Sequence, residues 1–245
     1  MARMKFYLGT HKAAWLARAG VPLFVSRRTL APRRTLPRAI APWALDSGGF
    51  TELNRNGNWE LSPRVYAQEV RRFRDEIGMM DWAAPQDWMC EPDIRLRSSL
   101  STRHHQMYTL LNYVTLLNLA PDLPWIPVLQ GWTLGDYLDH IEMYLKAGID
   151  LTKEDVVGVG SVCRRQGTIR SSLLFAWLAD ERLKLHGFGV KISGLKTYRQ
   201  HVVSADSMAW SFHARKHPPL PGHTHKSCAN CMEYALLWRK NHGLD

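Results

Sequence analysis

Three aspartates follow short apolar runs of this sequence, at positions where side chains could do chemistry. Asp46 and Asp206 each end such a run, and Asp87 comes shortly after a third. Any one of them could be a structural cap. Carboxylates gathered at one mouth repel one another, however, so three at equivalent strand ends indicate a site.

Small and amide residues accompany these carboxylates. A Ser-Gly-Gly sequence follows Asp46, where glycine lets the backbone approach a ligand and donate N–H groups. A Gln-Gly pair ends another apolar run, and its amide can read the edge of a base. A Gly-Val-Gly run leaves room for a flat ring but lacks the spacing of a dinucleotide fingerprint. The candidate substrate-binding residues are Ser47, Gly48, Asp87, Gln130, Gly131, Gly158 and Gly160.

A His/Cys cluster near the C-terminus indicates a structural zinc site. Cys228 and Cys231 are spaced to share one tetrahedral metal, and His225 is a natural third ligand. A redox Cys-x-x-Cys is the rival interpretation, but the early strand of a thioredoxin-like unit is missing before it. The other two cysteines, Cys90 and Cys163, are expected to be buried small hydrophobes. Candidates for the fourth zinc ligand are His223, His213, His217 and His242.

The charge of the chain favours a polyanionic partner. It has 32 Lys and Arg against 22 Asp and Glu, a net charge of +10. Five arginines crowd into the Pro-punctuated stretch 26–38, which predicts an exposed loop that contacts nucleic-acid phosphates. A solvated loop that only aids solubility is the alternative. These arginines are Arg27, Arg28, Arg33, Arg34 and Arg38.

The sequence also constrains where the protein works. No apolar run approaches the length of roughly 18–20 residues that spans a bilayer, and no secretory signal begins the chain. Four cysteines in 245 residues do not form a disulfide framework. We therefore expect a cytoplasmic protein without a membrane partner, in the host cytoplasm if a phage encodes it. A homodimer is the alternative to a monomer.

Short apolar runs alternate with helical patterns along the chain. The predicted strands cover residues 5–9, 22–26, 43–46, 80–84, 125–130, 156–160, 186–191 and 202–206. The predicted helices cover residues 63–77, 102–119, 134–147 and 169–185, with a closing helix at 232–240. Strands that alternate with helices indicate βαβ units and a parallel sheet.

Eight candidate strands predict an α/β fold, a compact (β/α)8 TIM-type barrel over residues 1–212. A doubly wound open sheet is the alternative. It would concentrate its site at one switch point, whereas the polar residues here follow several different strands. Residues 213–245 are expected to form a small zinc-binding segment and a closing helix packed on the barrel.

Taken in order, these motifs resemble the tRNA-guanine transglycosylase superfamily, and most closely its phage and bacterial deazapurine DNA-modification transglycosylases. The likeness runs from about Asp46 to Cys231, and its most specific part is the Asp-Ser-Gly-Gly-Phe element. The motifs that carry it are Asp46-Ser47-Gly48-Gly49-Phe50, Gln130-Gly131, Gly158-Val159-Gly160, His186-Gly187-Phe188-Gly189-Val190, Ser204-Ala205-Asp206-Ser207 and the C-terminal Cys-x-x-Cys.

The resemblance implies a zinc-containing barrel that exchanges guanine for a 7-deazaguanine such as preQ0 or preQ1. Matched residue by residue, Asp206 is the nucleophile that attacks the sugar C1′ and Asp46 is the general acid/base. Asp87 reads the Watson–Crick edge of the purine. Gln130, Gly131 and the segment 158–160 match the wall of the base pocket.

The sequence departs from the family pattern in two respects. Lys226 stands where the zinc knuckle usually has a third cysteine, and His225 is expected to substitute for it. The chain is also much shorter than the tRNA enzymes, so DNA is favoured as the substrate, with the base extruded or the strand single. The alternatives are a tRNA-guanine transglycosylase, an N-glycosidic hydrolase and a catalytically inactive nucleic-acid-binding barrel.

Overall fold

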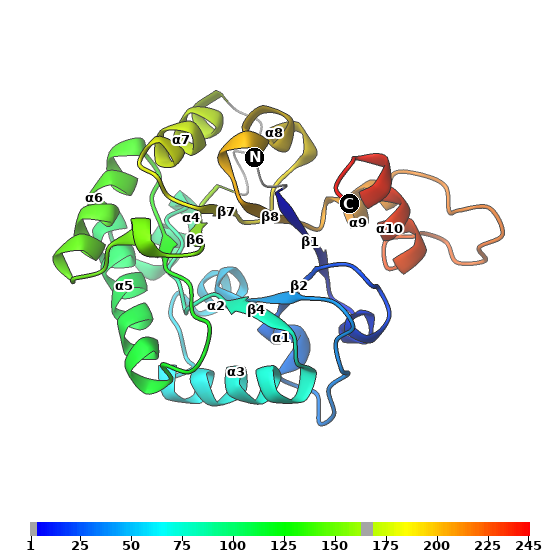
Figure 1. The fold of residues 1–245 in the computed structure, drawn as a ribbon, viewed down its shortest axis with the longest axis horizontal. Coiled ribbons are helices and arrows are strands. Elements are labelled where there is room, and N and C mark those ends of the chain that lie inside the picture. The colour runs from blue at the N-terminus through cyan, green and yellow to red at the C-terminus, as the bar shows by residue number, and fades with distance from the viewer. Residues whose placement is uncertain (1–3, 163–168) are drawn as a thin grey trace.

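The computed structural model describes residues 4–162 and 169–245 as a ring of eight parallel strands surrounded by helices (Figure 1). The strands are short and mostly buried, as strands covered on both faces are. The strands are β1 (Lys5–Thr10), β2 (Leu23–Ser26), β3 (Trp43–Asp46), β4 (Met80–Ala83), β5 (Val128–Leu129), β6 (Val157–Val159), β7 (Leu185–Gly187) and β8 (Ser204–Ser207).

The two ends of the sheet meet and close the ring. The strand order is β4-β3-β2-β1-β8-β7-β6-β5, which leaves β4 and β5 as edges. A parallel bridge joins Ala83 to Trp125. Two hydrogen bonds support it, from Ala83 N to the Pro124 carbonyl (2.9 Å) and from Ile126 N to the Ala83 carbonyl (3.2 Å). The prediction of a (β/α)8 barrel is therefore confirmed, and the doubly wound alternative is wrong.

Helices follow the strands and cover the outside of the ring. Ser62 caps α3 by accepting from Val65 N, and Pro63 occupies the first turn, so the predicted bounds 63–77 hold. The helices are α1 (Arg27–Leu30), α2 (Gly49–Asn56), α3 (Pro63–Ile77), α4 (Pro92–Ser98), α5 (Thr102–Leu119), α6 (Leu134–Lys146), α7 (Ile169–Asp180), α8 (Ile192–Tyr198), α9 (Ala209–Ala214) and α10 (Met232–Asn241). Within the described residues, three 3₁₀ turns lie in the connections that lead into strands: η1 (Ala13–Ala17), η2 (Leu151–Lys153) and η3 (Arg199–His201).

Several predicted elements are shorter than expected. The strand expected at 125–130 covers only Val128–Leu129, and two further elements end early because the backbone turns. The helix expected at 169–185 ends at Asp180, and the positive φ of Arg182 (65°) leads the chain back into β7. The strand expected at 186–191 ends at Gly187, since Gly189 has a φ of 57°. The arginine-rich stretch likewise differs from a plain loop, because its first residues form the single helical turn α1.

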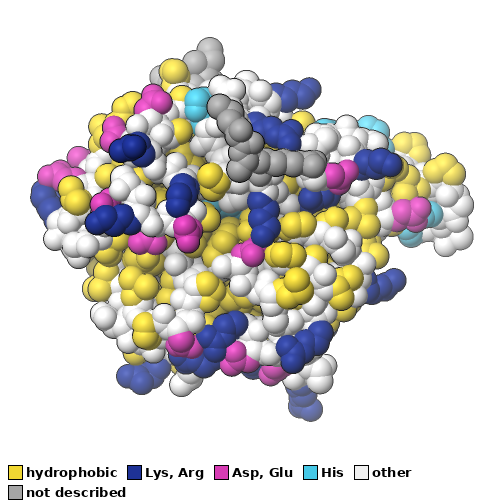
Figure 2. Space-filling view, viewed as in Figure 1, with side chains coloured by type: hydrophobic (Ala, Val, Ile, Leu, Met, Phe, Trp, Pro, Cys, Tyr) yellow, Lys and Arg dark blue, Asp and Glu magenta, His cyan; other side chains and the backbone are white. Residues whose placement is uncertain are grey.

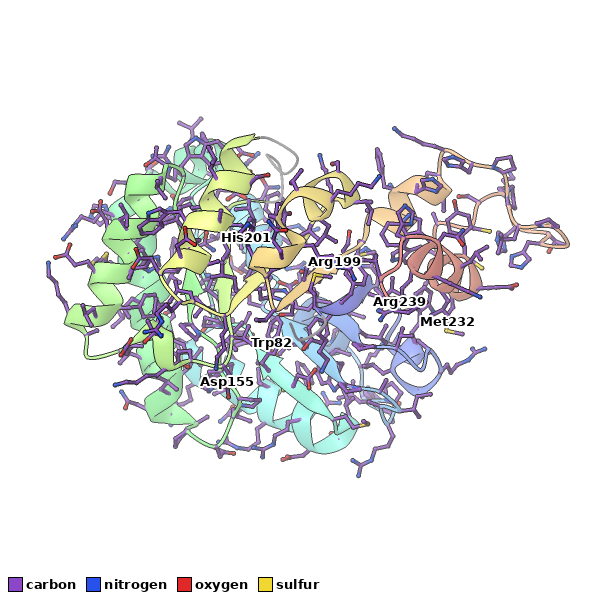
Figure 3. All side chains as sticks on the ribbon, turned by 45° about the horizontal axis from the view of Figure 1, so that its top comes forward. Trp82, Asp155, Arg199, His201, Met232 and Arg239 are labelled. Carbon is purple, nitrogen blue, oxygen red and sulfur yellow. The ribbon has the colours of Figure 1, made fainter. Side chains whose placement is uncertain are left out.

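The core divides between the space inside the ring and the layer between strands and helices. Inside the ring, Tyr7, Ala44, Trp82, Ala84 and Ile126 pack together, and Figure 3 labels Trp82 there. On the face drawn in Figure 2, a broad band of hydrophobic side chains crosses the middle, with charged side chains above and below it. Within the described residues, no helix is both long and apolar enough to cross a membrane.

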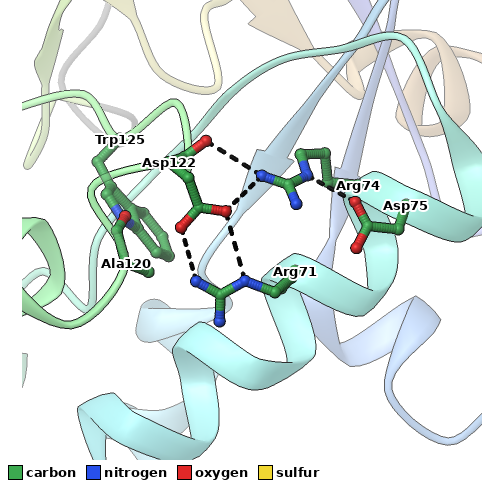
Figure 4. A network of polar contacts seen from close by, with 6 residues as sticks. All are labelled: Arg71, Arg74, Asp75, Ala120, Asp122 and Trp125. Carbon is green, nitrogen blue, oxygen red and sulfur yellow. Dashed lines mark hydrogen bonds and ion pairs between the residues drawn. The ribbon is translucent and has the colours of Figure 1, made fainter.

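Charged residues on α3 are neutralised within the protein. Arg71 and Arg74 both donate to the carboxylate of Asp122, which lies in the loop before β5 (Figure 4). Arg74 also donates to the neighbouring Asp75 (2.7 Å). These ion pairs tie α3 to the loop that enters β5, so part of the positive charge of the chain is already balanced here.

The C-terminal helices pack beside β1. Trp210 of α9 donates its indole N–H to the Gly9 carbonyl (2.8 Å). Arg239 of α10 is buried and donates to the Phe6 carbonyl (2.7 Å); Figure 3 labels it on its helix. Because β1 neighbours β8 in the sheet, these helices sit next to the end of the last strand.

Candidate active site

One cavity of about 980 Å³ opens at the carboxyl ends of the strands. It gathers residues that follow five different strands, as the active site of a barrel does. Its lining includes the predicted site residues Asp46, Asp87, Gln130, Gly160 and Asp206. The three carboxylates and the amide that were predicted from the sequence therefore line the same cavity.

Asp206 of β8 is held through one of its two carboxylate oxygens. The backbone N–H of Gly189 donates to Oδ1 (2.8 Å), and His186 Nε2 lies 3.3 Å from the same oxygen. An ionised carboxylate can only accept, so His186 donates from Nε2. With both donors on Oδ1, Oδ2 is the oxygen left to react with a ligand in the cavity.

His186 of β7 is fully buried and fixed in orientation. Its Nδ1 lies 2.9 Å from Ser204 Oγ, which donates to it when the ring is neutral and Nε2 carries the hydrogen. The rings of Trp82 and Phe188 pack edge-on against it, with centroids at 4.6 and 4.8 Å. The sequence analysis did not predict this contact with Asp206. The available signal was a histidine inside an otherwise apolar strand.

Asp46 ends β3 beside Ser26 of β2 in the sheet register. Burial raises the pKa of Asp46, and the negative charge of Asp206 also raises it. Hydrogen bonds from the Ser26 side chain and the Gly48 backbone oppose that rise. Gly48 has a φ of 81°, which favours glycine at this turn. A carboxyl group with a raised pKa keeps its proton to a higher pH than an exposed aspartate does, which favours a role as general acid.

Asp87 lies in a buried hydrogen-bond network after β4. Ser47 Oγ donates to its Oδ1 (2.9 Å), and Gln130 Nε2 donates to its Oδ2 (2.7 Å). Burial raises the pKa of Asp87 to about 7, with a further contribution from Asp46, against the lowering effect of these donors. Asp87 therefore changes charge close to neutral pH.

Gln130 connects Asp87 to the next strand. Ser161 Oγ donates to Gln130 Oε1 (2.6 Å) and lies 3.0 Å from Glu91 Oε2. This contact orients the amide, so that its N–H₂ points to Asp87. A Cβ at Gly160 would lie 2.2 Å from Gln130 Nε2, so only glycine leaves room for the amide. The sequence analysis missed Ser161 and Glu91, which line the cavity but stand in no distinctive motif.

The remaining predicted substrate-binding residues do not line the cavity but contact residues that shape it. Gly158 makes room for Phe188, whose ring would lie 2.6 Å from a Cβ there. Gly131 packs against α6, where a Cβ would lie 2.9 Å from the Tyr137 ring. Ser47 acts through Asp87, as described above. These residues shape the pocket rather than face it.

The His/Cys cluster is assembled as the spacing predicts, and His223 joins it. The ligand atoms of His223, His225, Cys228 and Cys231 all lie within 4.8 Å of one another. The predicted alternatives lie elsewhere: His213 stacks on His217, and His242 lies against Trp238. Four His and Cys ligands in such a cluster could hold a metal ion.

Two distances within the cluster suit a tetrahedral ion. Metal–sulfur bonds of about 2.3 Å and metal–nitrogen bonds of about 2.0 Å put tetrahedral ligand atoms roughly 3.3–3.8 Å apart. His223 Nδ1 lies 3.3 Å from His225 Nε2 and 3.7 Å from Cys231 Sγ, both within this range. His225 Nε2 lies 3.0 Å from Cys228 Sγ, closer than two ligands of one ion would be. His223 Nε2 contacts Glu233 (3.0 Å), the kind of outer carboxylate that orients a metal-binding histidine.

The arginine-rich stretch runs along the outside of α3. Arg27 is paired with Glu69 (2.5 Å), and Arg28 with Glu52 (3.1 Å) close to Gly48. Arg33 and Arg34 are exposed. Arg38 donates to the Asp75 carbonyl at the far end of α3. Of these five arginines, Arg28 thus lies nearest the turn that follows Asp46.

The other two cysteines, Cys90 and Cys163, were both expected to be buried. Cys90 is buried, as expected. Cys163 lies outside the described residues.

This chain is similar to solved structures and to one protein family. Among solved structures, one similar chain is a Coccidioides immitis protein named as a fructose-1,6-biphosphate aldolase, with a TM-score of 0.48 and 10% identity. That match covers 98% of this chain and 91% of the other. No curated protein matches. The model of one family, DpdA, matches residues 2–244. Because this match spans nearly the whole chain, the protein belongs to the DpdA family, DeoxyPurine in DNA protein A.

Proposed function

We propose that this chain replaces guanine in DNA by a 7-deazaguanine of the preQ0 or preQ1 type. The observation that carries the proposal is the pair Asp46 and Asp206, which share one cavity but differ in surroundings. Membership in a family named for deoxypurine in DNA supports DNA as the substrate. The motif likeness to tRNA-guanine transglycosylases supports base exchange as the reaction.

In the proposed first step, Asp206 Oδ2 attacks C1′ of the target nucleotide. The bond from C1′ to N9 breaks, and guanine leaves with a proton that Asp46 supplies. In the second step, Asp46 takes the N9 proton of the incoming 7-deazaguanine. That nitrogen then attacks C1′ and releases Asp206, so one base replaces the other and water takes no part.

Base recognition falls to Asp87 and Gln130. Ionised Asp87 would accept from N1–H and the exocyclic amino group of a guanine or deazaguanine. Gln130 is already oriented by Ser161 at the same wall. Phe188 and Gly160, which also line the cavity, give that wall a flat profile. A purine with this edge is the ligand that the wall suits.

A direct assay tests the proposal. DNA is incubated with the enzyme, with and without a 7-deazaguanine, and its nucleosides are analysed by mass spectrometry. If the enzyme exchanges bases, a deazaguanine nucleoside should appear in the DNA only when the free base is present. Abasic sites formed without added base would identify a hydrolase. Unchanged DNA that is nevertheless bound would identify an inactive binding barrel, and product in tRNA alone would identify a tRNA enzyme.

We further propose that the His/Cys cluster binds a structural zinc ion. Its donor set of two thiolates and two imidazoles suits zinc, and the ion would stabilise the segment 213–245 against the barrel. Elemental analysis should find about one zinc per chain in protein purified without added metal. Folded protein that contains no zinc would contradict this assignment.

The arginine-rich stretch remains a proposed contact with flanking DNA. Arg33 and Arg34 are exposed and could reach phosphates directly. Arg27 and Arg28 would first have to leave Glu69 and Glu52. Replacing Arg33 and Arg34 by Ala should lower the salt dependence of DNA binding by about one unit of log–log slope per lost contact. An unchanged slope would leave the stretch a solvated loop.

A further inference from the structure

A second group of positive charges lies beside the nucleophile strand, at the edge of the same cavity. We propose that it binds the phosphates of the DNA strand whose nucleotide enters the cavity, an assignment that rests on the proposed function. We call this group the α9 rim. It consists of the cations Lys12, Arg215 and Lys216 together with His11 and Phe212.

The topology brings the two parts of the rim together. His11 and Lys12 follow β1, and α9 follows β8, the strand that pairs with β1. The hydrogen bond from Trp210 of α9 to the Gly9 carbonyl joins the two connections. His11 and Lys216 both line the cavity that holds Asp206. The rim therefore borders the mouth on the side of the proposed nucleophile.

The positive charge of the rim is not balanced locally. Within residues 4–162 and 169–245, Lys12, Arg215 and Lys216 form no ion pair with a carboxylate. The charges of Arg215 and Lys12 also lower the pKa of His11, after burial as the larger cause. By contrast, Arg27 and Arg28 of the arginine-rich stretch and Arg71 and Arg74 of α3 all have carboxylate partners.

Phe212 adds a base-stacking surface to these charges. Its side chain is 59% exposed although it lines the cavity. The ammonium group of Lys216 lies 4.5 Å from the centre of the ring. An aromatic ring beside cations is the combination by which proteins hold single-stranded nucleic acid, with bases stacked and phosphates neutralised. The rim thus fits a strand whose bases are unpaired next to the extruded nucleotide.

The distance between sugar and phosphate explains why this position matters. In a nucleotide, both flanking phosphates lie within a few ångströms of the sugar. If Asp206 reaches C1′, cations at the border of the same cavity are placed to hold those phosphates. The rim would then position the reacting sugar as well as add affinity.

The test measures binding of a single-stranded DNA oligonucleotide over a range of salt concentrations. The double variant Arg215→Ala/Lys216→Ala should lower the slope of log K against log salt by about 1.4, at about 0.7 per contact on a single strand. Lys146→Ala/Lys153→Ala is the matched control, because it removes two exposed lysines from helical ends remote from the cavity. It should leave the slope unchanged.

The stacking half of the proposal is tested with a neutral substitution. Phe212→Ala should weaken binding about tenfold at every salt concentration without changing the slope, and Phe212→Trp should restore it. Circular dichroism of each variant confirms that the fold is retained. Wild-type slope in Arg215→Ala/Lys216→Ala would overturn the phosphate assignment, and full binding by Phe212→Ala would overturn the stacking assignment.

Base exchange by the wild type, assayed in parallel, distinguishes a wrong rim assignment from a wrong proposed function. If the wild type exchanges bases but the rim variants bind DNA as it does, the rim assignment is wrong and the proposed function stands. If the wild type neither binds DNA nor exchanges bases, the proposed function is wrong and the rim assignment falls with it.

Discussion

The two sides of the cavity treat their carboxylates in different ways. On the side of β3, β4 and β5, Asp46 is half-buried and Asp87 is buried, and loss of solvent raises the pKa of both. On the side of β7 and β8, Asp206 has two donors on a single oxygen, one from the backbone and one from His186. The first arrangement favours holding a proton, and the second favours a fixed anion.

This difference in surroundings distinguishes the proposed roles of aspartates whose side chains are chemically identical. A group that gives and takes protons needs a pKa close to the working pH, whereas a nucleophile needs a free, oriented oxygen. Environments that separate the behaviour of two carboxylates are how enzymes divide acid and nucleophile roles. The comparison therefore predicts graded losses when each side is altered.

The largest loss is expected from Asp206→Asn. The substitution keeps the shape of the side chain but removes the anionic oxygen, so base exchange should fall by about 10⁴-fold or more. Denaturing gels of enzyme trapped on DNA should show a covalent adduct with the wild type and none with the variant. DNA binding serves as the control and should persist. An adduct formed by Asp206→Asn would move the nucleophile to another residue.

Asp46→Asn should produce the next largest loss. Without a carboxyl group at this position, proton transfer to and from N9 is lost, which typically costs about 10²–10⁴-fold in rate. The adduct should still form, but slowly, because Asp206 is untouched. Single-turnover kinetics of adduct formation would measure this difference. A rate equal to that of the wild type would break the assignment of the acid/base role to the β3 side.

Asp87→Asn should affect base binding, and the effect should depend on pH. The pKa of about 7 means that the carboxyl is ionised above pH 7 and protonated below it. Only the ionised form accepts from both N1–H and the amino group, so wild-type affinity for the free deazaguanine should rise as pH increases through 7. The variant should lack this step and bind about 10–100-fold more weakly above it. Calorimetric titration at several pH values gives both quantities.

The same carboxyl predicts a sign for stability. Its pKa is raised in the folded protein, so the protonated form stabilises the fold and this contribution is lost as pH rises through about 7. Relative to Asp87→Asn, the wild type should therefore lose stability between pH 4 and pH 8. Thermal unfolding of both proteins across this range would show it, and a constant difference would contradict the assigned burial cost.

His186→Phe should have the smallest effect of the set, about tenfold on the rate of adduct formation. The ring keeps its packing against Trp82 and Phe188, but one of the two donors to Asp206 is lost. His186→Gln, whose amide can donate, should restore part of the rate. A purely structural role would make the two variants equally slow, whereas a positioning role separates them.

The sequence predicted the strands and their ends better than the contacts between them. Apolar runs that end in Asp46 or Asp206 mark strand ends directly, because parallel strands of a barrel place their carboxyl ends together. The contact of His186 with Asp206 depends on the pairing of β7 with β8 and on the orientation of a ring. No spacing in the sequence encodes either.

The metal cluster and the short helices show the same limit. The Cys-x-x-Cys spacing predicted two ligands, but choosing His223 over three other histidines required the path of the loop 215–227. The helices α2, α4, α8 and α9 were not predicted, since segments of six to eight residues carry too few turns for a clear periodicity. The unpaired charges of the α9 rim likewise emerge only when the ion pairs elsewhere are known.

The closure of the ring between β4 and β5 has a consequence for motion. In the part of the chain that the structure describes, the backbone joins these edges through a single bridge, Ala83 to Trp125, which makes this the thinnest seam of the barrel. Above it, the side chains of Asp87 and Gln130 form a second link, because one follows β4 and the other follows β5. A base held by both side chains would add a third. Amide hydrogens along this seam should therefore exchange with solvent faster than those of β1 and β8, and should slow when the base binds.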